Sequence, residues 1–381
     1  MERSKVMSKL IKILFLTILL QLGMGGDQPL QAALPYMSSS HYCLMDSETG
    51  QLIVSRNADE LRPVASTTKI LTAIVVLDYA DLNEVAVVSE HADHTPEYTI
   101  GLKAGQELEV GELLKAALVK SANDAAVVLA EHIAGDERFF AHLMNKKAFL
   151  MGASQTHFEN SSGLPSPEHL SSVYDLALLG RYALSIPEIA AMVEAPQVEF
   201  KHPGYLQPIV LRNTNSLLES YPGANGIKTG TTDAAGKCLV ASARRDGRQL
   251  IAVTLHSGNR NTDCARLLDY GFQQIRKVTV LSTEEAFKEI PAQNGQSIPI
   301  IVEHEVALWV GDETPNLEKK VHLDYQINGS VIKGERVGII SIFADGQHVE
   351  SVALLVGENI SSDKNSLEHW LKSFLNRLKE S

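Results

Sequence analysis

The sequence predicts an α+β fold: an antiparallel sheet flanked by helices, followed by a small all-β domain and a C-terminal amphipathic helix. Three observations lead to this prediction. Long apolar runs between residues 70 and 130 have helical length, residues 236–255 read as two strands joined by a turn, and short apolar runs broken by Gly, Pro and Asn follow residue 276. With 381 residues, 44% hydrophobic and 21% charged, the chain is an ordinary globular protein long enough for two domains.

The first 32 residues have the features of a signal peptide. A basic start is followed by the apolar run 10–20, which is too short to cross a bilayer comfortably. Small residues at 32–33 offer a cleavage site after Ala32. The sequence therefore predicts an exported protein.

A helix is expected to begin near Ser66, because Pro63 precedes it and the apolar run 70–77 follows. Ser66 and Lys69 are about one helical turn apart, so the lysine amine can reach the serine hydroxyl. Burial in such a helix would lower the pKa of Lys69 and leave a neutral amine able to act as a general base. The alternative is a serine cap with an exposed lysine one turn later.

Ser121-Ala-Asn123 lies between the apolar runs 113–119 and 125–130, so two helices are expected to meet there. Ser and Asn are common cap residues, and a junction without chemistry is one interpretation. In the other, Ser121 relays a proton to a leaving group, while the Asn123 amide binds a substrate amide and holds Lys69.

Lys228-Thr229-Gly230 is expected on an edge strand beside the hairpin formed by residues 236–243 and 249–255. Lys228 would supply positive charge, and Thr229 would bind a substrate carboxylate. Gly230 would leave room for a substrate backbone. Alternatively, the lysine only protects an exposed edge from aggregation.

The pattern changes near residue 276. Residues 267–272, just before this point, are expected to form the closing helix of the catalytic domain. Runs at 278–281, 298–302, 306–309 and 321–325, and the hairpin 337–356, predict an all-β module. The expected division is a signal peptide (1–32), a catalytic domain (33–275), a small all-β domain (276–360) and an amphipathic helix (361–381).

The C-terminal helix is a candidate membrane anchor. Its apolar residues recur at helical spacing on one face: Leu367, Trp370, Leu371, Phe374, Leu375 and Leu378. Such a face would bind a membrane surface, or it would pack onto the β module.

The order Ser66-Thr-Thr-Lys69, Ser121-Ala-Asn123, Lys228-Thr-Gly230 resembles the motif set of penicillin-binding proteins and class A β-lactamases. Single motifs arise by chance, as Ser361-Ser-Asp-Lys364 illustrates. Further blocks, among them Met144-Asn-Lys-Lys-Ala and the run 221–230, resemble low-molecular-mass penicillin-binding proteins, the serine-type D-alanyl-D-alanine carboxypeptidases. The resemblance covers roughly residues 42–275 and implies a β-lactamase/transpeptidase-like catalytic domain.

By this resemblance Ser66 is the acylated nucleophile and Lys69 its base. Ser121 and Lys228 form the proton path to the departing D-alanine. The N–H groups of Ser66 and Thr231 would form an oxyanion hole, and Arg260 would lie near the carboxylate, although Arg266 is close in sequence. No cofactor or metal is implied.

The resemblance implies peptidoglycan stem peptides as substrates, β-lactam antibiotics as inhibitors, and a location at the outer face of the cytoplasmic membrane. A β-lactamase is one alternative, although no Glu-x-x-x-Asn loop lies between Ser121 and Lys228; a penicillin-binding scaffold with little turnover is another. The net charge of −12 argues against nucleic acid as a partner. The cluster Glu90-His-Ala-Asp-His94 contains metal-ligand types, but we expect a solvated loop there.

Overall fold

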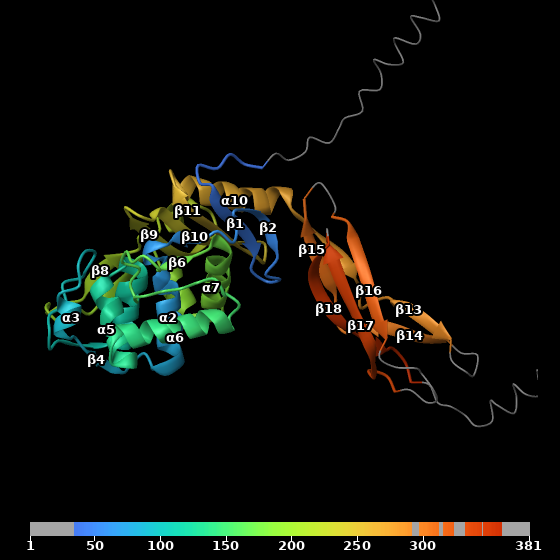
Figure 1. The fold of residues 1–381 in the computed structure, drawn as a ribbon, viewed down its shortest axis with the longest axis horizontal. Coiled ribbons are helices and arrows are strands. Elements are labelled where there is room, and N and C mark those ends of the chain that lie inside the picture. Colours follow the sequence, from blue (N-terminus) through green and yellow to red (C-terminus); the bar gives the residue numbers. More distant parts are fainter. Residues whose placement is uncertain (1–33, 292–296, 312–314, 324–331, 345, 360–381) are drawn as a thin grey trace, which may run out of the picture. The chain divides into compact units, whose positions relative to one another are not determined.

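A computed structural model describes residues 34–359, apart from 292–296, 312–314, 324–331 and 345 (Figure 1). All the elements described belong to the compact unit that begins at Tyr36. The expected signal peptide and the expected C-terminal helix lie outside the described residues.

A five-stranded antiparallel sheet forms the centre of the residues before 276, with the strand order β2-β1-β11-β10-β9. Its strands are β1 (His41–Asp46), β2 (Leu52–Arg56), β9 (Ala224–Thr232), β10 (Gly236–Arg245) and β11 (Arg248–Ser257). The predicted hairpin is β10 and β11, in which Ala241 pairs with Ala252. The Lys228-Thr-Gly230 motif lies on β9, the edge strand, as the sequence predicted.

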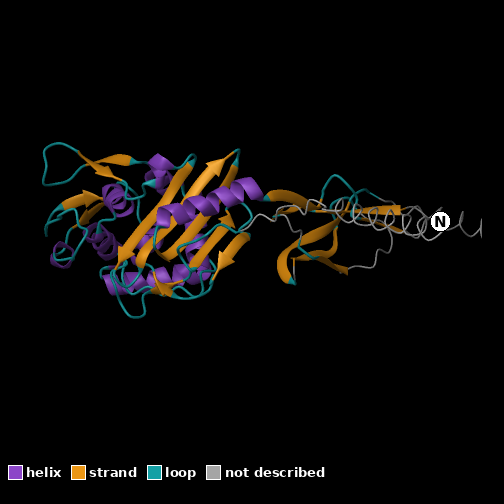
Figure 2. Cartoon of the chain, turned by 90° about the horizontal axis from the view of Figure 1, so that it is seen from above, coloured by secondary structure: helices purple, strands orange, loops and turns teal. Residues whose placement is uncertain are grey.

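Both faces of this sheet are buried, and the alternation of side chains along β1 shows how. Tyr42 and Leu44 belong to the apolar cluster that contains residues of α10 (Arg260–Gln274), which crosses one face in Figure 2. Cys43 and Met45 belong to the larger cluster on the other face, with residues of α2 (Lys69–Tyr79) and α7 (Val173–Ser185). Successive strand residues point to opposite faces, so one strand contributes to two cores.

The remaining elements before residue 276 include η1, which contains Ser66, and α5, which begins at Asn123. They are β3 (Arg62–Pro63), η1 (Ala65–Thr68), β4 (Val85–Val87), α3 (Glu90–Asp93), β5 (Glu107–Glu109), α4 (Val110–Lys115), η2 (Ala116–Lys120), α5 (Asn123–Ala134), α6 (Glu137–Leu150), β6 (Leu170–Ser171), α8 (Pro187–Glu194), β7 (Gln197–Phe200), β8 (Ile209–Arg212) and α9 (Leu217–Ser220). The helical segment expected to begin near Ser66 starts as the 3₁₀ turn η1 and continues as α2 from Lys69. One expectation needs correction: residues 90–93 form a helix with a Ser89 N-cap where a loop was expected.

After residue 276 the described elements are all strands. They are β12 (Arg276–Leu281), β13 (Lys288–Pro291), β14 (Ser297–Val302), β15 (Val306–Val310), β16 (Leu317–Leu323), β17 (Arg336–Ala344) and β18 (Gln347–Val356). One sheet has the order β13-β14-β18-β17-β16, and β12 pairs with β15. These strands have their own apolar cluster, which includes Leu281, Ile300 and Ile340. The expected all-β character of this region is confirmed.

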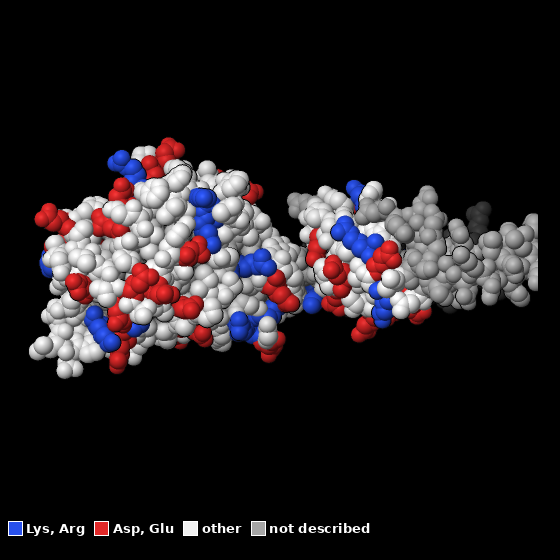
Figure 3. Space-filling view, turned by 90° about the horizontal axis from the view of Figure 1, so that it is seen from below, with Lys and Arg blue, Asp and Glu red and all other residues white. Residues whose placement is uncertain are grey.

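Among the described residues, charged side chains of both signs share the surface shown in Figure 3, and the three cysteines are buried. Acidic and basic side chains are interspersed on the face shown in Figure 3. Cys43, Cys238 and Cys264 are free and fully buried.

No described helix is by itself long and apolar enough to cross a membrane; α7 and α8 pass that test only as a pair bent by 104°. Within the same residues, no group of three or more His, Cys, Asp or Glu side chains could hold a metal ion.

Candidate active site

The turn before α2 brings Ser66 and Lys69 together. Lys69 Nζ donates to Ser66 Oγ at 3.0 Å, to Asn123 Oδ1 at 2.6 Å and to the Ser162 carbonyl at 2.6 Å. Lys69 is fully buried, whereas Ser66 is partly exposed. The serine can therefore be reached from solvent while its lysine partner remains protected from water.

The electrostatics of Lys69 favour the neutral amine. Burial and, after it, the charge of Lys228 hold the pKa of Lys69 well below its ordinary value of 10.5. A neutral amine 3.0 Å from a hydroxyl can accept its proton, which is what activation of a serine nucleophile requires. The pKa shift expected from the apolar helix is therefore present.

Ser121 occupies the corner between two helices. The π-helical turn η2 ends at Lys120, Ser121 adopts a left-handed conformation with φ of 69°, and α5 begins at Asn123. This reversal directs the Ser121 hydroxyl toward Lys228, whose Nζ donates to it at 2.9 Å and to the Thr229 carbonyl at 3.1 Å. Burial, with a smaller contribution from Arg260, lowers the pKa of Lys228 to about 7. Near neutral pH this pair can hold or release a proton.

Asn123 links Lys69 to a neighbouring loop. Its Oδ1 accepts from Lys69, while its Nδ2 donates to the carbonyls of Glu97 at 3.0 Å and Pro96 at 3.3 Å. The next residue, Asp124, fixes the same loop because its carboxylate accepts from the N–H groups of residues 100, 101 and 102. The amide donors of Asn123, expected to be available to a substrate, are thus already bonded within the protein.

The edge strand β9 approaches the nucleophile turn very closely at Gly230. A Cβ atom at this position would lie 2.8 Å from the Val64 carbonyl and 3.0 Å from the Ser66 nitrogen. Contacts this short exclude any side chain. The glycine is required by the approach of the protein's own backbone, a reason different from the room for substrate that the sequence suggested.

Polar groups beside Gly230 form a cationic end of the site. Arg260 Nη1 donates to the Gly230 carbonyl and to Thr231 Oγ1, both at 2.8 Å. Arg266, the alternative in sequence, instead donates to the Tyr36 carbonyl at 2.8 Å. Arg260 is therefore the arginine that accompanies the edge strand.

Two contributors to the site were not predicted. The Ser162 carbonyl accepts from Lys69, and Thr214 Oγ1 lies 2.6 Å from Thr229 Oγ1. Backbone carbonyls leave no sequence signal, because every residue has one. Thr214 is 15 positions before Thr229, and nothing in this spacing indicated a contact between them.

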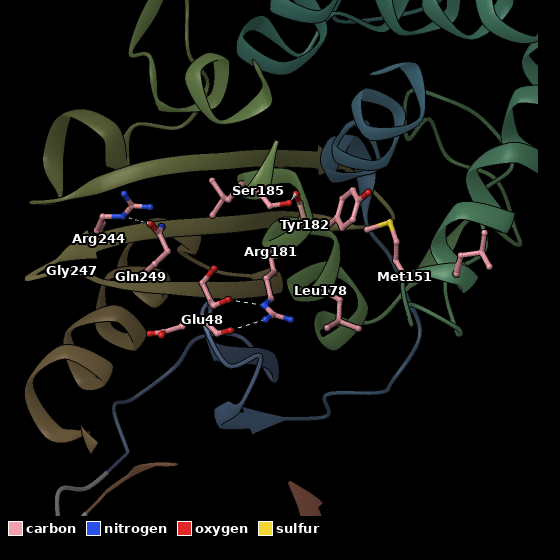
Figure 4. Close-up of a pocket in the computed structure, with 12 residues that line it drawn as sticks. Glu48, Met151, Leu178, Arg181, Tyr182, Ser185, Arg244, Gly247 and Gln249 are labelled. Carbon is pink, nitrogen blue, oxygen red and sulfur yellow. Dashed lines mark hydrogen bonds between the residues drawn. The ribbon is translucent and has the colours of Figure 1, made fainter. Parts of the chain in front are cut away.

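A pocket of about 630 Å³ lies away from these residues, between α7, the β1–β2 turn and the β10–β11 turn (Figure 4). Arg181 crosses it and donates to the carbonyls of Ser47 and Glu48. None of the nine predicted site residues lines this pocket.

These groups define a class of protein. A serine bonded to a buried lysine whose neutral form is favoured, next to a second Lys–Ser pair whose lysine lies on an edge strand, is the arrangement of the serine acyltransferases that penicillin acylates. The comparisons specify the family. Residues 28–259 match Peptidase S11, the D-alanyl-D-alanine carboxypeptidases, and the chain belongs to this family.

Curated relatives match over most of the chain. The D-alanyl-D-alanine carboxypeptidase DacC of Escherichia coli strain K12 is 31% identical over 372 residues, which cover 91% of this chain and 90% of the relative. DacF of Bacillus subtilis strain 168, described in the same way, is 29% identical over 316 residues, covering 80% and 81%. The match therefore extends beyond the three motifs.

Solved structures match in fold. Penicillin-binding protein 5 from Haemophilus influenzae has a TM-score of 0.71 at 25% identity, covering 87% of this chain and all of that one. The D-alanyl-D-alanine carboxypeptidase DacD from Francisella tularensis has a TM-score of 0.69 at 26% identity, covering 88% and 97%. The expected penicillin-binding-protein fold is confirmed.

Proposed function

We propose that this protein is a serine D-alanyl-D-alanine carboxypeptidase that removes the terminal D-alanine from peptidoglycan stem peptides through an acyl-enzyme. The observation that carries the proposal is the 3.0 Å hydrogen bond between Ser66 Oγ and the buried Lys69 amine. Family membership supplies the substrate class. β-Lactams would acylate the same serine and inhibit the enzyme.

Acylation begins when Ser66 Oγ attacks the carbonyl carbon between the two D-alanine residues. The proton of Oγ passes to neutral Lys69, whose pKa is held down by burial and by Lys228. Negative charge then develops on the carbonyl oxygen, and we assign its stabilisation to the N–H groups of Ser66 and Thr231. Gly230, which precedes Thr231, lets the strand pack against the backbone at Ser66, as an oxyanion hole made of these two donors would require.

Departure of D-alanine requires a proton on its nitrogen. We assign this step to Ser121, whose hydroxyl accepts from Lys228 at 2.9 Å. The proton that Ser121 gives up is replaced from Lys228, and the C–N bond breaks as the acyl-enzyme forms. Water then attacks the ester, and its proton passes to Lys228, which the first step left neutral. Lys69 returns its proton to Ser66 Oγ as the ester bond breaks, so the free enzyme is restored.

Recognition of the free carboxylate is assigned to Thr229 with Arg260 nearby. The Thr229 hydroxyl is held by Thr214 at 2.6 Å, and Arg260 contributes positive charge to the end of β9. Charge-assisted hydrogen bonds to a carboxylate are stronger than neutral ones, so this end of the site would favour a C-terminal residue over an internal peptide bond.

The proposed location is the outer face of the cytoplasmic membrane. The proposed division is a signal peptide (1–32), a catalytic domain (33–275), a β domain (276–360) and an anchoring helix (361–381). Removal of residues 364–381 should abolish binding to anionic vesicles while leaving carboxypeptidase activity unchanged. Equal vesicle binding, or unfolding of the shortened protein, would make the helix a packing element.

The test of the activity uses the purified protein with a diacylated D-Ala-D-Ala peptide and, separately, with penicillin. We expect release of free D-alanine and a long-lived penicillin adduct on Ser66, both detected by mass spectrometry. Fast penicillin hydrolysis with little D-alanine release would identify a β-lactamase. A stable adduct without peptide turnover would identify a penicillin-binding scaffold.

A further inference from the structure

His169 is a buried titratable residue to which the reaction above gives no role. It is 2% exposed, and its ring stacks on Phe158 with centroids 4.6 Å apart. His169 Nε2 also lies 2.7 Å from Thr68 Oγ1, although Thr68 is 101 positions earlier in the chain. Thr68 belongs to the turn that carries Ser66. The histidine is thus in contact with the nucleophile segment without touching the nucleophile.

The hydrogen bonds around His169 fix its tautomer. The backbone N–H of Glu159 donates to Nδ1 at 3.1 Å, so Nδ1 carries no proton. Burial lowers the pKa of His169 to about 4, which keeps the ring neutral and places its single proton on Nε2. Nε2–H therefore donates to Thr68 Oγ1.

Thr68 passes this hydrogen bond on to the backbone. Because its oxygen accepts from His169, its own proton is free to donate to the Ala65 carbonyl, at 2.9 Å. The result is a directed chain from the Glu159 N–H through His169 and Thr68 to Ala65. Each donor in this chain has one acceptor, an arrangement that holds a buried polar network in a single geometry.

The residue at the end of the chain is strained and adjacent to the nucleophile. Ala65 has a φ of 50°, a left-handed conformation that alanine rarely adopts. Its carbonyl also lies against Gly163, where a Cβ atom would come within 2.1 Å of it. The direction of that carbonyl sets the orientation of the peptide unit that supplies the Ser66 N–H, one of the two proposed oxyanion donors.

We propose that His169 is a positioning residue for acylation: by donating through Thr68 to the Ala65 carbonyl, it keeps the strained turn before Ser66 in its reactive orientation. This inference rests on the proposed function. It assigns no contact between His169 and substrate.

Two substitutions of His169 separate its hydrogen bonds. In His169→Gln the side-chain amide can reach the position of Nε2 and donate to Thr68, whereas in His169→Asn it reaches only the position of Nδ1. We expect the Asn variant to lose about ten- to a hundredfold in the rate constant of acylation by penicillin, and the Gln variant to recover most of it. His157→Asn, which changes an exposed histidine next to Phe158, is the matched control and should acylate at the wild-type rate.

A second pair of variants tests the chain at the threonine. Thr68→Val removes the hydroxyl that bonds Ala65, and Thr67→Val removes the equivalent bond from the neighbouring buried hydroxyl to the Val64 carbonyl at 2.9 Å. Thr67→Val loses one buried hydrogen bond and Thr68→Val loses two, its bond to Ala65 and the bond it accepts from His169, so both variants should melt at a lower temperature than the wild type. Only Thr68→Val should slow acylation strongly, and Thr68→Val/His169→Asn should be no slower than Thr68→Val alone.

The measurements are the acylation rate constant by stopped-flow and the melting temperature, on the purified full chain. Acylation losses that follow melting temperature in all variants, including Thr67→Val, would overturn the proposal and leave His169 a packing residue. So would multiplicative effects in the double variant. A wild-type protein that penicillin does not acylate would instead contradict the proposed function, so the two failures are distinguishable.

Discussion

Lys228 should make the stability of the protein depend on pH in a defined window. This lysine is buried, and its pKa falls from 10.5 to about 7, chiefly through desolvation. At about 1.4 kcal/mol for each pH unit, keeping the ammonium form in the folded protein costs about 5 kcal/mol relative to the neutral amine. Between pH 7 and 10.5 Lys228 therefore binds a proton in the unfolded chain and not in the folded protein, and this site makes stability rise with pH.

The perturbation is Lys228→Met, which keeps the length of the side chain and removes the titrating group. Loss of the bonds to Ser121 and Thr229 shifts the stability of the variant by an amount that changes little with pH. Lys69 titrates in both proteins, so only the pH dependence contributed by Lys228 distinguishes the wild type from the variant. Between pH 7.5 and 9.5 the wild type should gain about 1.4 kcal/mol per pH unit relative to the variant.

Urea unfolding at several pH values from 6 to 9.5 measures this difference. Below pH 7 the two curves should run parallel, because both states of the wild type then hold the Lys228 proton. Lys237→Met, which removes an exposed lysine on the adjacent strand, is the control and should follow the wild type throughout. Parallel curves for wild type and Lys228→Met above pH 7.5 would refute the reasoning.

Three further outcomes are expected. Ser66→Ala should lose at least about a thousandfold in D-alanine release, roughly 4 kcal/mol of barrier, and should form no penicillin adduct; an adduct on any other serine would contradict the assignment. Thr229→Val should reduce turnover of a substrate with a free carboxylate about ten- to a hundredfold while sparing its amide analogue, and equal losses on both would count against carboxylate recognition. Asp124→Asn should lower the free energy of unfolding in urea by about 2 kcal/mol, because the N–H groups of residues 100, 101 and 102 lose their charged acceptor; an unchanged urea midpoint would show that the 100–102 loop does not depend on this carboxylate.

Local spacing accounts for what the sequence predicted correctly. Ser66 and Lys69 are close in the chain, so their contact follows from one turn of helix, and the strand alternation from 236 to 255 predicted the hairpin directly. The pairing of Ser121 with Lys228 joins residues 107 positions apart and could be expected only from the family resemblance. The bond of Thr68 to His169 had no such guide.

The role of Gly230 shows the limit of reasoning from residue type alone. Glycine indicated that something approaches the strand closely, and that was correct. Which group approaches depends on the packing of β9 against the nucleophile turn, and such a contact between distant segments has no local signal. The same holds for Asn123, whose amide orientation is set by the carbonyls of the 96–97 loop.

The three buried thiols give the protein an internal set of chemical probes. Burial raises the pKa of Cys238 to about 11 and that of Cys264 to about 12, and raises that of Cys43 as well, so none of them reacts readily while the fold is closed. Cys43 and Cys238 lie in strands of the central sheet, and Cys264 lies in the helix that covers it. Alkylation of each thiol therefore reports how often that layer opens, without any engineered label. Comparing the three rates before and after penicillin is bound would show whether acylation tightens the sheet, its covering helix, or both together.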